Sequence, residues 1–298
     1  MFLFILFLRL VASVTLFTPS AFRFDLLFCA VSAVLSISNS TRQYPRTVLA
    51  HMVAPYDDQF SSLGDISAEF YCMLIDVPVN YNGFNHSYDE SEIWLGNYKK
   101  AWSNNPVWVL REVIMNVDWG KRRYEPNLQV DNASFYYWAK YCDQLLPSVI
   151  DGVMQPRHTF NDSISDVRDL DNFMSYICSS FRGALFERNG IYYLIVDTLT
   201  EPKFFVTSEM ITDVGFTYAK TELSTRWNFV RAKFQNQDLD YDTDTRIVTN
   251  QSSIDKYGLI SGEVQPVGCT NLSEILRHAA YALLTNSYET TLVSFQLH

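Results

Sequence analysis

The spacing of hydrophobic residues along this chain changes at Gly183 from a helical repeat to an alternating one. That change limits what the chain can fold into. Residues 167–182 carry one apolar stripe at helical spacing. Residues 184–197 then follow a period of two on either side of Asn189 and Gly190, the dipeptide favoured in two-residue hairpin turns. One chain therefore contains both patterns. We predict an α+β fold in which helices pack on an antiparallel β-sheet and hairpins.

Capping signals predict where the helices begin. Asn271, followed by Glu274 three residues later, forms a capping-box pattern. Asp131 or Asn132 can cap a second helix, and Asp166 can cap a third. A further helix starts with a proline, which the first helical position tolerates because its N–H is not needed there. We expect helices over residues 106–116, 132–146, 167–182 and 272–286.

Strand patterns and turn residues account for much of the remaining sequence. Residues 78–91 and the acidic stretch 238–245 are predicted to be loops. The expected strands cover residues 66–77, 157–161, 184–188, 191–197, 203–207, 213–220, 226–235 and 290–297.

The first 38 residues differ from the rest in being almost entirely apolar, with Arg9, Arg23 and Asp25 as their only charges. Their apolar runs are shorter than the roughly 20 residues that span a bilayer. Apolar residues also precede the first arginine, which reverses the order found in signal peptides. Two interpretations stay open: a signal peptide or membrane tether, and a non-native start. In either case we expect this segment to add nothing to the packed core.

These patterns divide the chain into three parts. We expect an apolar leader over residues 1–43, a mixed strand and helix region over 44–183, and a mainly antiparallel β region with one helix over 184–298.

Composition excludes two broad classes of protein. Hydrophobic residues make up 48% of the chain and charged residues 19%, which excludes a disordered chain. The formal net charge is -10, whereas nucleic-acid binders are normally basic. We therefore expect no nucleic-acid binding.

The cysteines do not form a recognisable metal or redox motif. Their number is odd, they are widely spaced, and no C-x-x-C pair occurs. We expect reduced and mostly buried side chains at Cys29, Cys72, Cys142, Cys178 and Cys269.

A search for catalytic motifs gives no candidate. The sequence has no P-loop, no G-x-G-x-x-G after a strand, no H-E-x-x-H and no G-x-S-x-G. Cys269 and His278 lie nine residues apart, but no third group is apparent that would orient a nucleophile pair. No histidine stands at metal-ligand spacing from another histidine or a cysteine; the five are His51, His86, His158, His278 and His298. We therefore expect no catalytic, cofactor-binding or metal-binding residue and no enzymatic activity.

Two charged clusters favour structural interpretations. The run of Asp238, Asp240, Asp242 and Asp244 lacks the glycine and glutamate of a calcium loop, so we interpret it as a solvated loop. The basic cluster 121–123 is interpreted as an inter-subunit salt-bridge patch or an exposed loop rather than a nucleic-acid contact.

Several stretches, taken together and in order, resemble the host specificity protein J family, the tail tip attachment proteins of lambdoid phages. They extend from Tyr44 to Leu297, although none of them is a catalytic signature. The stretches are YPRTVLAHMVAPYDDQF (44–60), VPVNYN (77–82), WLGNYKKAWSNNPVWVLREVI (94–114), YYWAKYCDQLLP (136–147), PRHTFN (156–161), ICSSFRGALFERNGIYYLIVD (177–197) and the segment 254–297.

This resemblance implies a virion structural protein located at the phage tail tip. It implies a hub-like fold, a homotrimer in the parent assembly, and contacts with other tail-tip and tape-measure proteins that support receptor attachment. The chain departs from the family pattern at both ends, so we expect a truncated prophage piece without the receptor-binding part and with weak self-association. We expect Trp94, Trp102, Trp119 and Tyr124 to be exposed on its remaining assembly face.

Two alternatives belong to other classes. Residues 1–38 are compatible with a membrane-tethered or secreted adhesin-like surface protein, which would be membrane-associated only if the leader is real. A tail-associated hydrolase with an unrecognised site is the other alternative.

Overall fold

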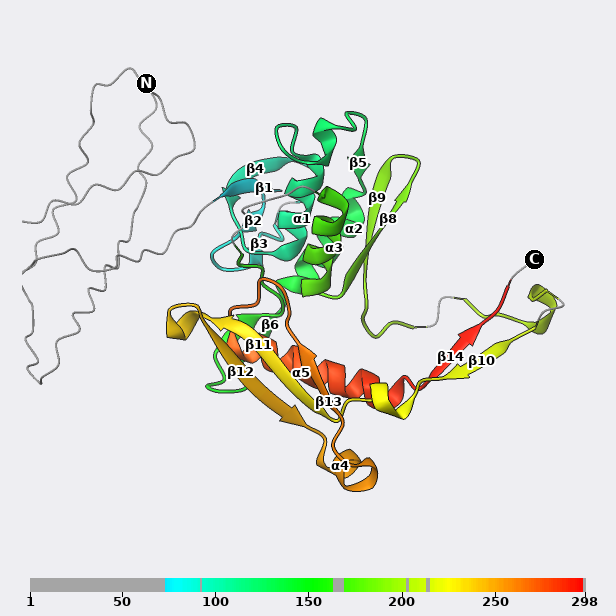
Figure 1. The fold of residues 1–298 in the computed structure, drawn as a ribbon. Helices are drawn as coiled ribbons and strands as arrows, with labels where there is room; N and C mark the ends of the chain where they lie inside the picture. Colours follow the sequence, from blue (N-terminus) through cyan, green and yellow to red (C-terminus); the bar gives the residue numbers. More distant parts are fainter. Residues whose placement is uncertain (1–72, 92, 163–168, 202–203, 213–214, 297–298) are drawn as a thin grey trace, which may run out of the picture. The chain divides into compact units, whose positions relative to one another are not determined.

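The computed structural model describes residues 73–91, 93–162, 169–201, 204–212 and 215–296. Within these ranges the chain is a mixed α+β protein, as predicted (Figure 1). The predicted leader and the first part of the strand 66–77 lie outside the described residues, and the boundaries at residues 43 and 183 stay a prediction. No helix in these ranges combines the length and hydrophobicity needed to cross a membrane.

Local signals in the sequence explain the helix starts. Asn105, Asp131 and Asn271 accept hydrogen bonds from the backbone of the first turns of their helices. Asp169 caps the third helix in the same way, whereas the predicted cap Asp166 lies outside the described residues. The helices are α1 (Pro106–Met115), α2 (Asn132–Cys142), α3 (Leu170–Ser180), α4 (Gln251–Tyr257) and α5 (Leu272–Tyr288).

The strands form several small sheets rather than one large sheet. Strand β9 lies between β8 and β5, β11 lies between β12 and β13, and the other strands pair as β1–β4, β2–β3, β6–β7 and β10–β14. The strands are β1 (Leu74–Pro78), β2 (Tyr81–Asn82), β3 (Ser87–Tyr88), β4 (Tyr98–Trp102), β5 (Gln129–Val130), β6 (Leu145–Pro147), β7 (Met154–Pro156), β8 (Gly183–Arg188), β9 (Ile191–Val196), β10 (Thr217–Lys220), β11 (Phe229–Asn236), β12 (Asp242–Thr249), β13 (Ser261–Val264) and β14 (Thr291–Ser294).

The predicted hairpin is confirmed. Strands β8 and β9 pair antiparallel, with Arg188 opposite Ile191. Asn189 and Gly190 have φ angles of 56° and 75°, the left-handed conformation that a type I′ turn requires at both positions.

Two hydrophobic cores hold these elements. In the first, α1 packs against α2, α3 and β1 (Figure 1). Trp108, Phe135 and Ile177 are fully buried there. In the second, α5 packs on β11 and β12, with Ile275 and Ala279 fully buried. Each large aliphatic or aromatic side chain buried in this way contributes about 1.5–3 kcal/mol.

Several predicted boundaries are wrong because of contacts between distant segments. Helix α2 ends at Cys142 rather than at residue 146, since residues 145–147 form β6 and pair with β7. Residues 157–161 are not a strand. The backbone N–H groups of residues 158–161 donate in turn to Cys142 O, the Glu274 carboxylate, Asn104 O and Gly268 O, so no single neighbour forms a ladder with them.

The acidic stretch 238–245 is not entirely a loop. Asp240 and Tyr241 have φ angles of 53° and 63° and turn the chain into β12, which pairs with β11 along its full length. The Asp-Thr alternation from Asp242 is an exposed strand pattern. Residues 204–207, predicted as part of a strand, have no regular structure. The predicted loop 78–91 contains strands β2 and β3. Strands β4, β5, β7 and β13 and helix α4 were not predicted.

Candidate functional site

A buried carboxylate organises the polar interior of the first core. Asp143 follows the last residue of α2. Its Oδ1 accepts hydrogen bonds from His86 Nδ1 at 2.7 Å and Tyr81 OH at 3.3 Å, and its Oδ2 accepts from Tyr88 OH at 2.7 Å and Asn105 Nδ2 at 2.6 Å. Both carboxylate oxygens are therefore satisfied by two donors each.

The protonation of these donors follows from the acceptor. An ionised carboxylate can only accept hydrogen bonds. The His86 nitrogen that faces Asp143 is Nδ1, so this nitrogen carries a proton. Burial and the Asp143 charge raise the pKa of Tyr88 well above its ordinary value. Burial, with the same charge, raises the pKa of Tyr81. Both phenols therefore stay protonated as donors.

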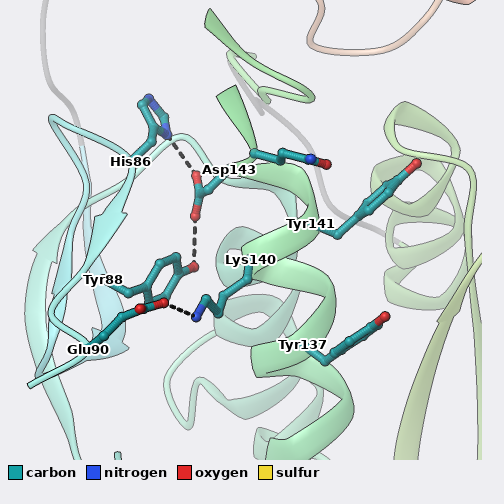
Figure 2. Close-up of a pocket in the computed structure, with 8 residues that line it drawn as sticks. His86, Tyr88, Glu90, Tyr137, Lys140, Tyr141 and Asp143 are labelled. Carbon is teal, nitrogen blue, oxygen red and sulfur yellow. Dashed lines mark hydrogen bonds and ion pairs between the residues drawn. The ribbon is translucent and has the colours of Figure 1, made fainter. Parts of the chain in front are cut away.

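An open pocket of about 520 Å³ lies beside this network, between the β2–β3 turn and α2. Figure 2 shows His86 and Tyr88 pointing toward Asp143, and Lys140 reaching Glu90, with which it forms a 3.1 Å ion pair. The lining residues are His86, Tyr88, Glu90, Tyr137, Lys140, Tyr141, Asp143 and Gln144.

The pocket contains some of the groups that an acid–base catalytic site requires. Asp143 holds the His86 ring as a triad carboxylate holds its histidine. None of the lining residues carries an aliphatic hydroxyl or a thiol that this histidine could activate. Among the described residues, the arrangement can bind and orient polar groups but offers no serine, threonine or cysteine nucleophile.

The cysteine prediction is confirmed where it can be examined. Cys142, Cys178 and Cys269 are free and buried, while Cys29 and Cys72 lie outside the described residues. Burial raises the pKa of Cys178 to about 12 and also raises the pKa values of Cys142 and Cys269. These three side chains are thiols rather than nucleophilic thiolates.

The two charged clusters make contacts within the chain. Lys121 pairs with Asp171, Arg123 donates to Asp118 O at 2.8 Å, and Arg122 donates to Pro126 O at 3.3 Å. Asp244 pairs with Arg246 at 2.8 Å. The basic cluster thus has partners within this chain.

Cys269 and His278 do not act as a pair. The Cys269 thiol donates to Asn271 O at 3.6 Å. His278 instead joins Glu274 and His158, and one potential ligand atom from each of these three residues lies within 4.8 Å of the others. Sequence reasoning missed this buried cluster, which could hold a metal ion. His51 and His298 lie outside the described residues.

The sequence did not reveal the cluster for two reasons: the capping-box pattern at Glu274 and the long sequence separation of its partners. Glu274 looked like the second residue of a capping box, but its carboxylate accepts from Thr159 N at 3.0 Å and Thr159 Oγ1 at 2.8 Å. Thr159 and Glu274 are 115 residues apart. The spacing of four residues between Glu274 and His278 places both on one face of α5, and this was the available clue.

Comparison with known proteins supports the family resemblance. No family model matches the chain. It is 29% identical over 251 residues to the tip attachment protein J of Escherichia phage SECphi27, a match that covers 84% of this chain and 21% of the relative. It is 24% identical over 270 residues to the tip attachment protein J of Escherichia phage SECphi4, covering 90% of this chain and 23% of that relative. The chain spans about a fifth of the length of these relatives, and over most of its own length it is similar to tip attachment protein J.

Proposed function

We propose that this chain is a structural component of a phage tail tip and forms part of the hub at the distal end of the tail. The observation that carries this proposal is the similarity to two tip attachment proteins over most of the chain. The role is one of assembly rather than catalysis. In the virion the chain supports receptor attachment by holding the tip together.

An exposed two-stranded ribbon is suited to an assembly contact. All residues of β10 and β14 are exposed, and within the described residues no third strand joins either edge. An isolated pair of strands is marginally stable in water. The large apolar side chains on and beside the ribbon that remain exposed are Phe216, Tyr218, Leu292, Val293 and Phe295.

Most of the aromatic residues expected on the assembly face are partly buried, so we assign the contact to the ribbon instead. Trp94 stacks on Tyr136 with ring centroids 4.5 Å apart, and Trp119 packs against the first core. Trp102 is partly buried, so Tyr124, at 70% exposure, is the one of these four residues that is exposed. We propose that the ribbon contacts a neighbouring copy of the chain in a homotrimer, and that other surfaces face the remaining tail-tip and tape-measure proteins.

Immunogold electron microscopy tests the location. Antibodies against this chain are expected to label the tail tips of particles induced from the host that carries the gene. Label confined to the bacterial envelope, with none on particles, would contradict the proposal and support the adhesin-like alternative.

The ribbon contact has its own test in the same particles. Tyr218→Asp should lower incorporation of the chain into virions because it places a charge in the proposed contact. Leu239→Asp is the matched control, since Leu239 is 52% exposed and lies outside the ribbon. Equal incorporation of both variants would show that the ribbon makes no contact that incorporation requires.

Self-association of the isolated chain should be weak. A stable interface buries roughly 1,600 Å² in total. Because the chain spans about a fifth of its relatives, we expect other parts of the assembly to supply much of that area. Sedimentation at micromolar concentration tests this expectation, and a tight trimer would contradict it.

A further inference from the structure

We propose that His158, Glu274 and His278 bind a divalent transition-metal ion, with Zn²⁺ as the best fit, and that the ion ties the segment 157–161 to helix α5. This site is independent of the tail-tip role. It also departs from the expectation, drawn from the sequence, that the chain has no metal-binding residue.

The spacing of the three side chains suits a tetrahedral ion. His158 Nδ1 lies 3.5 Å from Glu274 Oε1, and His278 Nε2 lies 3.8 Å from the same oxygen. Ligand atoms about 2.1 Å from a tetrahedral zinc ion are about 3.4 Å apart. The observed separations are close to this value and longer than a normal hydrogen bond.

The histidines have nitrogen atoms available for coordination. His158 and His278 side chains are 5% and 9% exposed. Both ring nitrogens of His158, and Nε2 of His278, have no hydrogen-bond partner. Buried polar atoms are nearly always satisfied, so unpaired nitrogens directed at one carboxylate point to a ligand between them.

The carboxylate is held in place for coordination. Thr159 donates from its backbone N to Glu274 Oε1 and from its hydroxyl to Oε2. Partners of this kind orient metal ligands and increase affinity. Two imidazoles and one carboxylate are a ligand set that zinc uses in proteins, with a fourth position for water or an anion.

Nearby arginines do not occupy the site. The Arg277 guanidinium donates to Ser273 Oγ, Pro156 O and Arg157 O, and Arg182 stacks on the Tyr281 ring at 3.9 Å. Among the described residues, no arginine lies within ion-pair distance of Glu274, whose Oε1 faces the two histidines at 3.5 and 3.8 Å. The positive charge of the arginines opposes a dication and favours an anionic fourth ligand.

Cobalt titration of the full chain tests the proposal. The protein is purified without a polyhistidine tag, stripped with a chelator and titrated with Co²⁺, whose visible absorption reports tetrahedral coordination. We expect one ion per chain, displaced by Zn²⁺, and a higher melting temperature with zinc. His278→Ala and Glu274→Gln should each weaken binding at least about 10-fold, and Thr159→Val about 10-fold.

Glu289→Gln is the matched control for Glu274→Gln, because Glu289 is an exposed glutamate at the C-terminal end of α5 and lies outside the cluster. It should bind cobalt as the unaltered chain does. The absence of a tetrahedral spectrum in the folded, unaltered chain, or an equal loss of binding in the Glu289 variant, would overturn the proposal. If a cluster variant does not fold, anomalous diffraction from zinc-soaked crystals of the unaltered chain decides: a peak between the three side chains supports the site, and its absence refutes it.

Discussion

Two of the three carboxylates that are buried within the described residues, Asp143 and Glu274, differ in how completely the polypeptide satisfies them. Asp143 accepts four hydrogen bonds of 2.6–3.3 Å from four different residues. Glu274 accepts two from Thr159 and faces two histidines at 3.5 and 3.8 Å, beyond normal hydrogen-bond distance. The first site is complete without a ligand, and the second keeps histidine nitrogens without a hydrogen-bond partner, to which the proposed ion would bind.

This difference distinguishes a buried charge that stabilises the fold from a buried charge that is arranged to bind a ligand. A buried carboxylate with all its lone pairs engaged fixes local geometry and cannot accept a ligand without losing bonds. A buried carboxylate beside unpaired imidazoles gains contacts when an ion arrives. The two sites should therefore respond differently to substitution and to zinc.

The largest expected effect comes from Asp143→Asn. The substitution removes the negative charge that all four hydrogen bonds engage, and the new NH₂ finds an acceptor only if His86 changes its tautomer or a tyrosine hydroxyl rotates. We expect a loss of about 3–5 kcal/mol in the free energy of unfolding, measured by urea denaturation. A loss below about 1 kcal/mol would show that the network is not the complete site described here.

Zinc should slow thiol labelling more at Cys269 than at Cys178. Cys269 belongs to the second core and Cys178 to the first, and both are buried thiols. Zinc at 100 times its dissociation constant stabilises by about 2.7 kcal/mol, which slows labelling of Cys269 up to about 100-fold. Mass spectrometry of the labelled peptides measures both rates. The effect on Cys269 should vanish in His278→Ala, and equal slowing of Cys178 would contradict the separation of the sites.

Glu274→Gln should be mild in the metal-free chain. A glutamine oxygen can still accept from Thr159 N, while its NH₂ can donate to the Thr159 hydroxyl, which accepts as well as it donates. We expect a loss of about 1 kcal/mol by urea denaturation. A loss as large as that of Asp143→Asn would make the two carboxylates equivalent.

The smallest effect is expected at the pocket rim. Glu90 is an exposed partner of Lys140, with 80% of its side chain accessible. Glu90→Gln should change the free energy of unfolding by no more than about 0.5 kcal/mol. A larger change would mean that the pocket, and not only the Asp143 network, stabilises the first core.

Sequence patterns predicted the elements whose signals are local. The caps at Asn271 and Asp131 and the Asn189-Gly190 turn lie within a few residues of the elements they control. The resemblance to a tail-tip family also came from the sequence, and the comparisons confirm it.

Elements that depend on distant partners were missed. Strand β13 is defined by its parallel pairing with β11, and the segment 157–161 by bonds to four separate parts of the chain. Glu274 shows, for a single residue, that a local pattern does not reveal a distant partner. Its position predicted a helix cap, but Thr159, 115 residues away, engages its carboxylate. Local spacing cannot reveal which of two partners a side chain takes.

Hydrogen exchange with and without zinc tests the central contrast most directly. The full chain is stripped with a chelator, and amide exchange is followed by mass spectrometry before and after zinc is added. We predict slower exchange in residues 157–161 and in α5, and unchanged exchange around Asp143 in residues 81–88 and 139–143. Unchanged exchange in residues 157–161 and α5 would contradict the account, because the cluster around Glu274 would then be as complete without an ion as the network around Asp143.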